Sequence, residues 1–163
     1  MTRTIKSELE RQQLQEHFES LKYEAYITLL LHRPMKLESA HSLVDQWDRR
    51  MSRQITGRNF HRACQRPNRM KYWGAAEESL EGHRHYHLLI SLPNAEMLNP
   101  FQHCLSSVWT QTLSGGTSYI SSTGPFLVDD VERMVSYNLK AVDVDDTGHL
   151  NTESLVFSRV SAV

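Results

Sequence analysis

The sequence predicts an α+β fold in which helices pack on a central antiparallel β-sheet. Residues Ala25–His32 (AYITLLLH) are apolar and rich in β-formers, and Pro34 follows them, which is typical of a buried strand. Met70–Glu78 and Arg84–Leu92 have strand character and are separated by a short connection, which indicates an antiparallel hairpin. Amphipathic helical segments lie between the strands, so the helices are expected to cover the sheet.

The remaining elements follow from periodicity and end signals. In chain order, helices are predicted over Ser7–Lys22, Ser39–Ile55, Pro100–Leu113 and from Asp129 or Asp130 to Val142. Gly57 is placed to end the second helix, Asn99 to cap the third, and Asp129 or Asp130 to cap the fourth. A further strand is predicted over Thr117–Ser122, and the tail Leu155–Val160 either adds a strand or frays.

Length and composition favour a single domain over residues 1–163, with a core of about 23–145, an N-terminal helix at 1–22 and a C-terminal tail at 146–163. Apolar residues make up 39% of the chain, enough for one ordinary core. No apolar run is long enough to span a membrane, and no secretory signal is visible. Cys64 and Cys104 are far apart, which argues against a disulfide framework or zinc knuckle and favours a reducing compartment.

Charge is unevenly distributed although the net charge is only -1. The stretch from Arg49 to Lys71 contains basic residues and no acidic ones, whereas acidic residues dominate the C-terminal part. Such a stretch fits either a surface that contacts phosphates or a solvated helix face followed by a loop. The residues expected to contact DNA phosphates are Arg49, Arg53, Arg58, Arg62, Arg66, Arg69 and Lys71.

The segment from His83 to Ile90 (HRHYHLLI) carries the strongest chemical signal. Alternate side chains of a strand share a face, so His85 and His87 project together while Tyr86 and Leu88 face the core. Two imidazoles at this spacing can bind one metal ion. In the predicted hairpin, either Glu77 or Glu78 projects to the same side. Two imidazoles, a carboxylate and open positions suit Mg²⁺ or Mn²⁺ touching a substrate oxygen.

A tyrosine on the last predicted helix gives a second signal. Val131, Met134, Val135, Leu139 and Val142 form its apolar stripe. Tyr137 lies off this stripe, with Arg133 four residues before it and Lys140 three residues after it. A phenol flanked by cations can act as a nucleophile on a phosphodiester, with Lys140 stabilising the phosphoryl oxygens. Arg133 is expected to contact DNA there.

Together these motifs resemble those of the HUH endonuclease family, and within it the single-tyrosine initiators of rolling-circle replication. The resembling segments are an apolar strand (Ile27-Thr28-Leu29-Leu30), His-hydrophobic-His followed by apolar residues (His85-Tyr86-His87-Leu88-Leu89-Ile90) and Tyr-x-x-Lys (Tyr137-Asn138-Leu139-Lys140). Family members often carry a Glu seven or eight residues before the first histidine, which fits both glutamates; Glu77 is preferred. The first motif lacks a second Thr, and one tyrosine stands in the nucleophile motif.

The resemblance implies an RRM-like core with the metal site on one sheet face and the tyrosine helix over it. It implies sequence-specific nicking and joining of single-stranded DNA, at an origin or hairpin site of a plasmid or phage, through a covalent 5′-phosphotyrosine. A host helicase is a possible partner, and the cytoplasm of a bacterial or archaeal cell is the expected location.

Three other functions remain open at the level of sequence. The chain could be a single-tyrosine HUH transposase, although Lys140 favours an initiator, or a non-catalytic DNA-binding derivative of such an enzyme. It could also be a histidine-triad nucleotide hydrolase, since His83 extends the pattern to His-x-His-x-His. Such a hydrolase would use His85 as nucleophile without metal and would not depend on Tyr137.

Overall fold

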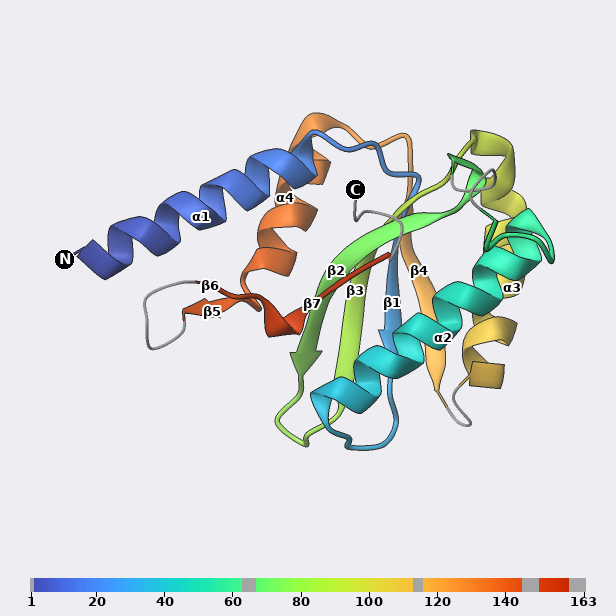
Figure 1. The fold of residues 1–163 in the computed structure, drawn as a ribbon, viewed down its shortest axis with the longest axis horizontal. Coiled ribbons are helices and arrows are strands. Elements are labelled where there is room, and N and C mark those ends of the chain that lie inside the picture. Colours follow the sequence, from blue (N-terminus) through green and yellow to red (C-terminus); the bar gives the residue numbers. More distant parts are fainter. Residues whose placement is uncertain (1, 63–66, 113–115, 145–149, 159–163) are drawn as a thin grey trace.

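A computed structural model gives the fold and describes residues 2–62, 67–112, 116–144 and 150–158. The predicted α+β class with an antiparallel sheet is confirmed (Figure 1). The sheet contains β1 (Ala25–Leu30), β2 (Lys71–Glu78), β3 (Arg84–Ser91), β4 (Thr117–Thr123) and β7 (Leu155–Phe157). They lie in the order β4-β1-β3-β2-β7, and each neighbouring pair is antiparallel.

Four helices surround this sheet: α1 (Thr2–Glu19), α2 (Leu37–Thr56), α3 (Leu98–Thr112) and α4 (Val128–Leu139). From β1 to β4 the chain runs β-α-β-β-α-β, the split βαβ arrangement. Short elements complete the described residues: 3-10 helices η2 (Ala95–Met97) and η3 (Thr152–Ser154), and a two-stranded ribbon of β5 (Asp143–Val144) and β6 (Leu150–Asn151). None of the helices is long and apolar enough to cross a membrane, in the part of the chain that is described.

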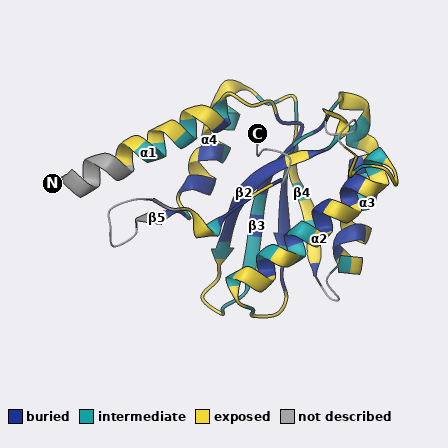
Figure 2. Cartoon of the chain, viewed as in Figure 1, coloured by how far each residue is buried: buried dark blue, intermediate teal, exposed yellow. Residues whose placement is uncertain are grey.

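The first sheet face, which we call the α2/α3 face, is fully covered. Alternate residues of β3, Tyr86, Leu88 and Ile90, are completely buried there against α2 and α3. Trp47 of α2 is also completely buried, with its ring edge-on to Tyr72 of β2 at 5.7 Å. The buried positions of α2, which Figure 2 colours dark blue, recur along one side of the helix and cover this side of the sheet.

The opposite face, which we call the α1/α4 face, is covered only in part. Phe18 of α1 stacks on Trp73 of β2, with ring centroids 3.7 Å apart. The Trp73 indole donates to the Tyr23 hydroxyl at 2.6 Å, and that hydroxyl donates to the Phe18 carbonyl at 2.7 Å. Val135 and Leu139 of α4 are buried in the same cluster. Both helices thus anchor to β2 and to each other.

Two predicted helix caps are wrong. Asn94, not Asn99, accepts from a backbone amide, that of Met97, and starts η2; α3 then begins at Leu98. At α4 the cap position is Leu127, and Asp130 lies inside the first turn, where it accepts from the Leu127 amide at 3.3 Å. Each helix thus begins one or two residues before the predicted start, which places the predicted Asx residue inside the helix rather than at its cap.

The C-terminal tail adds β7 to the sheet beside β2, which is one of the two predicted outcomes. The sheet therefore extends past the predicted core boundary near residue 145. Predicted residues 113 and 159–160 lie outside the described part of the chain.

Gly74 in β2 allows the hairpin to close tightly behind the histidines. A Cβ atom at this position would lie 1.9 Å from the carbonyl oxygen of His87. Any side chain at position 74 would therefore force β2 and β3 apart at the residue that carries the second imidazole.

Candidate metal centre and tyrosine

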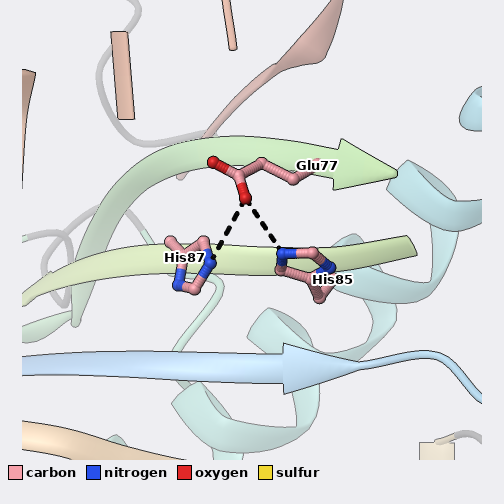
Figure 3. A group of neighbouring side chains, drawn as sticks. All are labelled: Glu77, His85 and His87. Atoms are coloured by element: carbon pink, nitrogen blue, oxygen red, sulfur yellow. Dashed lines mark hydrogen bonds and ion pairs between the residues drawn. The ribbon is translucent and has the colours of Figure 1, made fainter. Parts of the chain in front are cut away.

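Three side chains from the β2–β3 hairpin converge on the α1/α4 face (Figure 3). Glu77 is the cross-strand partner of His85, and His87 follows two residues later on the same face of β3. One carboxylate oxygen, Glu77 Oε2, lies 3.0 Å from His85 Nε2 and 3.7 Å from His87 Nε2. The imidazole rings stand almost perpendicular, with centroids 5.0 Å apart. The strand-alternation prediction for both histidines is confirmed.

The donor set fits a divalent cation. One ligand atom from each of the three residues can be chosen so that all lie within 4.8 Å of one another. Neighbouring ligands around an ion with bonds of about 2.1 Å lie roughly 3–4 Å apart, so only small side-chain rotations would be needed. All three side chains are partly exposed, which leaves space for further oxygen ligands.

A chain of hydroxyl groups orients His87 from behind. The Thr28 hydroxyl of β1 lies 3.1 Å from His87 Nδ1 and 3.2 Å from the Ser121 hydroxyl of β4. Because Nδ1 is engaged there, Nε2 points toward Glu77. Burial lowers the pKa of His87 below its usual value, an effect opposed by Glu77 and reinforced by His85. The imidazole is therefore neutral at pH 7, as metal binding requires.

Tyr137 of α4 lies directly over this group. Its hydroxyl donates to Glu77 Oε2 at 3.3 Å, and its ring is edge-on to that of His87 with centroids 5.2 Å apart. The side chain remains 40% exposed, so a substrate can reach it. Partial burial raises the pKa of the phenol, and the charge of Glu77 and the hydrogen bond to it act in the same direction. The hydroxyl is thus protonated in the resting protein.

Lys140 and Arg11 meet at the C-terminal end of α4. The Lys140 ammonium lies 5.7 Å from the centre of the Tyr137 ring, as the Tyr-x-x-Lys spacing predicts. Arg11 of α1 donates to the carbonyl of Leu139 and, at 2.8 Å, to that of Val142. The Leu139 carbonyl also accepts from the Val142 amide at 3.2 Å, so the guanidinium adds a second donor at the end of α4 and ties α1 to the turn that carries Lys140.

Two other candidates of the histidine region lie apart from this group. Glu78, the alternative carboxylate ligand, points to the other side of β2, where it pairs with Arg84 at 2.5 Å. His83 precedes β3 and lies 3.9 Å from Glu81. Glu78 points away from the histidines because neighbouring residues of a strand face opposite sides of the sheet. His83 lies apart because it precedes the paired residues of β3.

The predicted phosphate-contacting arginines do not surround the metal centre. Arg49 and Arg53 are exposed on α2, which covers the opposite face of the sheet, and Arg58 follows the end of that helix. Arg53 and Arg58, together with Arg50, line a pocket of about 490 Å³. Arg62 is exposed in the segment between α2 and β2, and Lys71 is exposed at the first position of β2. Arg66 is outside the described residues.

Arg69 and Arg133 already have acidic partners. The Arg69 side chain is only 13% exposed and lies 3.5 Å from buried Asp48, so its guanidinium is already paired with a carboxylate, and its contact with DNA stays a prediction. Arg133 pairs with Asp130 one turn earlier, but its side chain remains 75% exposed beside the tyrosine. It is therefore the one arginine of the predicted set that lines the site itself, among the described residues.

Sequence reasoning did not identify Ser121 or Arg11, and it did not connect Thr28 with His87. Alternation along Thr117–Ser122 could have paired Ser121 with a neighbouring strand, but not with a particular residue. Arg11 continues the spacing of Leu14 and Phe18 along α1, which was a usable signal for an inward-facing side chain.

No protein-family model, curated protein or solved structure gives a significant match to this chain. A functional assignment must therefore rest on the chemistry of the residues themselves.

Proposed function

We propose that this protein is a metal-dependent enzyme that nicks and rejoins single-stranded DNA, with Tyr137 as nucleophile. The observation that carries the proposal is the 3.3 Å contact between the Tyr137 hydroxyl and Glu77, the same oxygen that faces both imidazoles. Two motifs separated by some fifty residues thus converge on one small region. Structural packing alone gives no reason for a phenol, two imidazoles, a carboxylate and an ammonium to gather there.

The reaction is a transesterification that balances without a co-reactant. The Tyr137 oxygen forms a bond to phosphorus, and the bond from phosphorus to the 3′ oxygen breaks. Tyr137 loses a proton, and the leaving oxygen takes one up to become a 3′ hydroxyl. The phosphotyrosine retains the phosphoester bond, so a 3′ hydroxyl can reverse the step and join strands.

Each residue has a distinct part in this scheme. Glu77, His85 and His87 would hold Mg²⁺ or Mn²⁺, which supplies positive charge to the phosphoryl oxygens. Lys140, whose ammonium lies 5.7 Å from the centre of the Tyr137 ring, would add a further positive charge. Thr28 and Ser121 keep His87 oriented, and Arg11 holds the end of α4.

The order of elements adds support at the level of the fold. The β-α-β-β-α-β order agrees with the RRM-like core of HUH endonucleases, which the motifs resemble. We therefore place the activity in initiation of rolling-circle replication on a plasmid or phage, with a host helicase as partner and single-tyrosine transposition as the related alternative. The convergence of Tyr137 on the histidines speaks against a histidine-triad hydrolase, which would have no use for that tyrosine.

The test is covalent capture of DNA. Purified protein is incubated with Mn²⁺ and a random pool of single-stranded DNA, and protein-linked strands are isolated under denaturing conditions and sequenced. We expect a defined cleavage site and a protein–DNA adduct. Tyr137→Phe should reduce the adduct at least about 1,000-fold, because it removes the hydroxyl that lies against Glu77.

Tyr86→Phe is the matched control. It removes a phenol hydroxyl from β3, on the α2/α3 face, where that hydroxyl has no hydrogen-bond partner. This variant should form adduct at the wild-type level. A chelator should abolish the reaction of both the wild type and Tyr86→Phe. Normal cleavage by Tyr137→Phe would refute the mechanism, and DNA binding without cleavage would favour a non-catalytic derivative.

A further inference from the structure

A pocket of about 380 Å³ adjoins the candidate centre on the side of β1 and β4. Thr28 and His87 line it from the sheet, Tyr119 and Ser121 from the edge strand β4, and Tyr137 from α4. His87 and Tyr137 thus border both the pocket and the centre. A ligand in this pocket would lie directly beside the nucleophile, and the volume is within the range of pockets that bind small molecules.

Strand register places Tyr119 in line with the metal ligands. Tyr119 is the cross-strand partner of Thr28, and Thr28 is the partner of His87. Directly paired residues project to the same face, so the Tyr119 side chain shares the α1/α4 face with His87. Two strand spacings put their Cα atoms about 10 Å apart, a distance that one ligand can bridge.

Tyr119 is unusually exposed for an aromatic residue in a strand. Its exposed fraction is 52%, and β4 is an edge strand whose residues alternate between exposed and half-buried (Figure 2). The packing of the protein therefore leaves much of this ring free. An aromatic surface beside a pocket is what a planar base needs for stacking.

The rest of the lining suits the sugar and phosphate of the same ligand. Ser122 and Ser121 offer hydroxyl groups, and the exposed guanidinium of Arg133 adds a cation. One of its nitrogens is engaged by Asp130, but an arginine has further donors for a phosphate oxygen. Base, sugar and phosphate would thus each meet a matching group.

We propose that this pocket binds one unpaired nucleotide of the DNA strand, next to the phosphate that Tyr137 attacks, with its base stacked on Tyr119. The proposal rests on the proposed function for its ligand. It gives a physical reason for the single-stranded substrate of that function, because bases inside a duplex are already stacked on each other and cannot reach Tyr119.

The experiment measures binding separately from cleavage. Fluorescence anisotropy follows a labelled random pool of single-stranded DNA in EDTA, which prevents metal-dependent cleavage. Tyr119→Ala should raise the Kd about 5- to 100-fold, and Tyr119→Phe, which keeps the ring, should stay within about 2-fold of wild type. Because Tyr119 is half-exposed on an edge strand, neither variant should impair folding, which circular dichroism can verify.

Phe157→Ala provides the matched control. Phe157 is 42% exposed on β7, the opposite edge of the sheet, where its ring stacks on Phe18 at 5.9 Å, so the variant removes a ring of similar size and exposure away from the pocket, and circular dichroism verifies its fold as well. It should bind DNA as wild type does. The inference is overturned if Tyr119→Ala binds normally, if Phe157→Ala loses as much affinity, or if duplex DNA binds as well as the single strand.

These results are distinguishable from failure of the proposed function. Loss of binding in Tyr119→Ala together with absence of any covalent adduct in wild type would support the nucleotide pocket and refute the nicking activity. Normal binding by Tyr119→Ala together with an adduct on Tyr137 would refute the pocket and leave the nicking activity standing.

Discussion

The two faces of the sheet are built from the same strands, but their side chains differ in burial and in chemical character. On the α2/α3 face, α2 lies along the sheet and buries Tyr86 and Leu88 completely. On the α1/α4 face, the intervening residues His85 and His87 remain partly exposed, because the buried residues of α1 and α4 pack against Trp73 and, among the described residues of these helices, only the half-exposed side chain of Tyr137 reaches over them. Adjacent residues of one strand thus have different environments. Along this part of β3, the completely buried side chains lie on one face and the candidate metal ligands on the other.

Removing the largest side chain of the α2/α3 face should produce the greatest loss of stability. Trp47 is completely buried, so Trp47→Ala should lower the free energy of unfolding by about 3–5 kcal/mol through lost burial and a cavity. Urea unfolding measures this loss. If the faces are independent, the Mn²⁺ affinity of the folded variant, measured by calorimetry, should not change.

Trp47→Phe sharpens this comparison. The Trp47 indole nitrogen has no hydrogen-bond partner, so the smaller ring loses volume but no polar contact. It should cost clearly less than the alanine substitution. A loss below about 1 kcal/mol in Trp47→Ala, or a large change in its Mn²⁺ affinity, would contradict the separation of the faces.

A pH effect of intermediate size should come from Asp48, which is 3% exposed on α2. Burial raises the pKa of its carboxyl to about 6 despite the nearby Arg69 and Ser52, whereas its usual value is 3.8. Between these values the folded protein holds a proton that the unfolded chain has lost. The free energy of unfolding should therefore fall as pH rises from about 4 to about 6, by roughly 2–3 kcal/mol.

Asp48→Asn removes this titration. Urea unfolding gives the free energy of unfolding of each protein near pH 4 and near pH 7, and hence its change between the two pH values. The contributions of other titrating groups to this change largely cancel when the two proteins are compared. The wild type should lose more stability than the variant as pH rises. Equal losses would show that burial does not perturb this carboxyl.

The smallest of these effects concerns the hydroxyl behind His87. Thr28→Val keeps the shape of the side chain but removes the contacts with His87 Nδ1 and the Ser121 hydroxyl. The imidazole is then less well oriented, and the Kd for Mn²⁺ should rise about 10-fold. Thr28→Ser, which keeps a hydroxyl, should restore binding. Unchanged affinity in Thr28→Val would show that Thr28 serves packing alone.

Local pattern predicted most of what lies within one strand or helix. The alternation of His85, Tyr86 and His87 placed the imidazoles on a shared face, and the apolar stripe of the last helix left Tyr137 off the core. The distance from Tyr137 to Glu77 could not be predicted from periodicity, because it depends on how α4 docks beside β2. That docking depends in turn on Arg11, far away in the sequence.

The basic stretch from Arg49 to Lys71 shows what the sequence could not predict. Its composition predicted a phosphate-contacting surface but carried no information on where that surface would lie. The residues that pack α2 on the sheet, such as Trp47 and Met51, direct Arg49 and Arg53 away from it. Arg69 has the same charge, yet the buried carboxylate of Asp48 takes up its guanidinium. The charge pattern alone cannot distinguish an exposed arginine from one that is paired with a buried carboxylate.

The contact of Arg11 with the end of α4 has a practical consequence for handling the protein. Arg11 of the first helix donates to the carbonyls of Leu139 and Val142, so shortening the N-terminus past this residue would remove both contacts and loosen the turn that carries Lys140. If the proposed function holds, a shortened protein that folds but forms no DNA adduct would be explained by displacement of Tyr137. Affinity tags and fusions are therefore better attached with a spacer ahead of the first residue than by trimming into this helix.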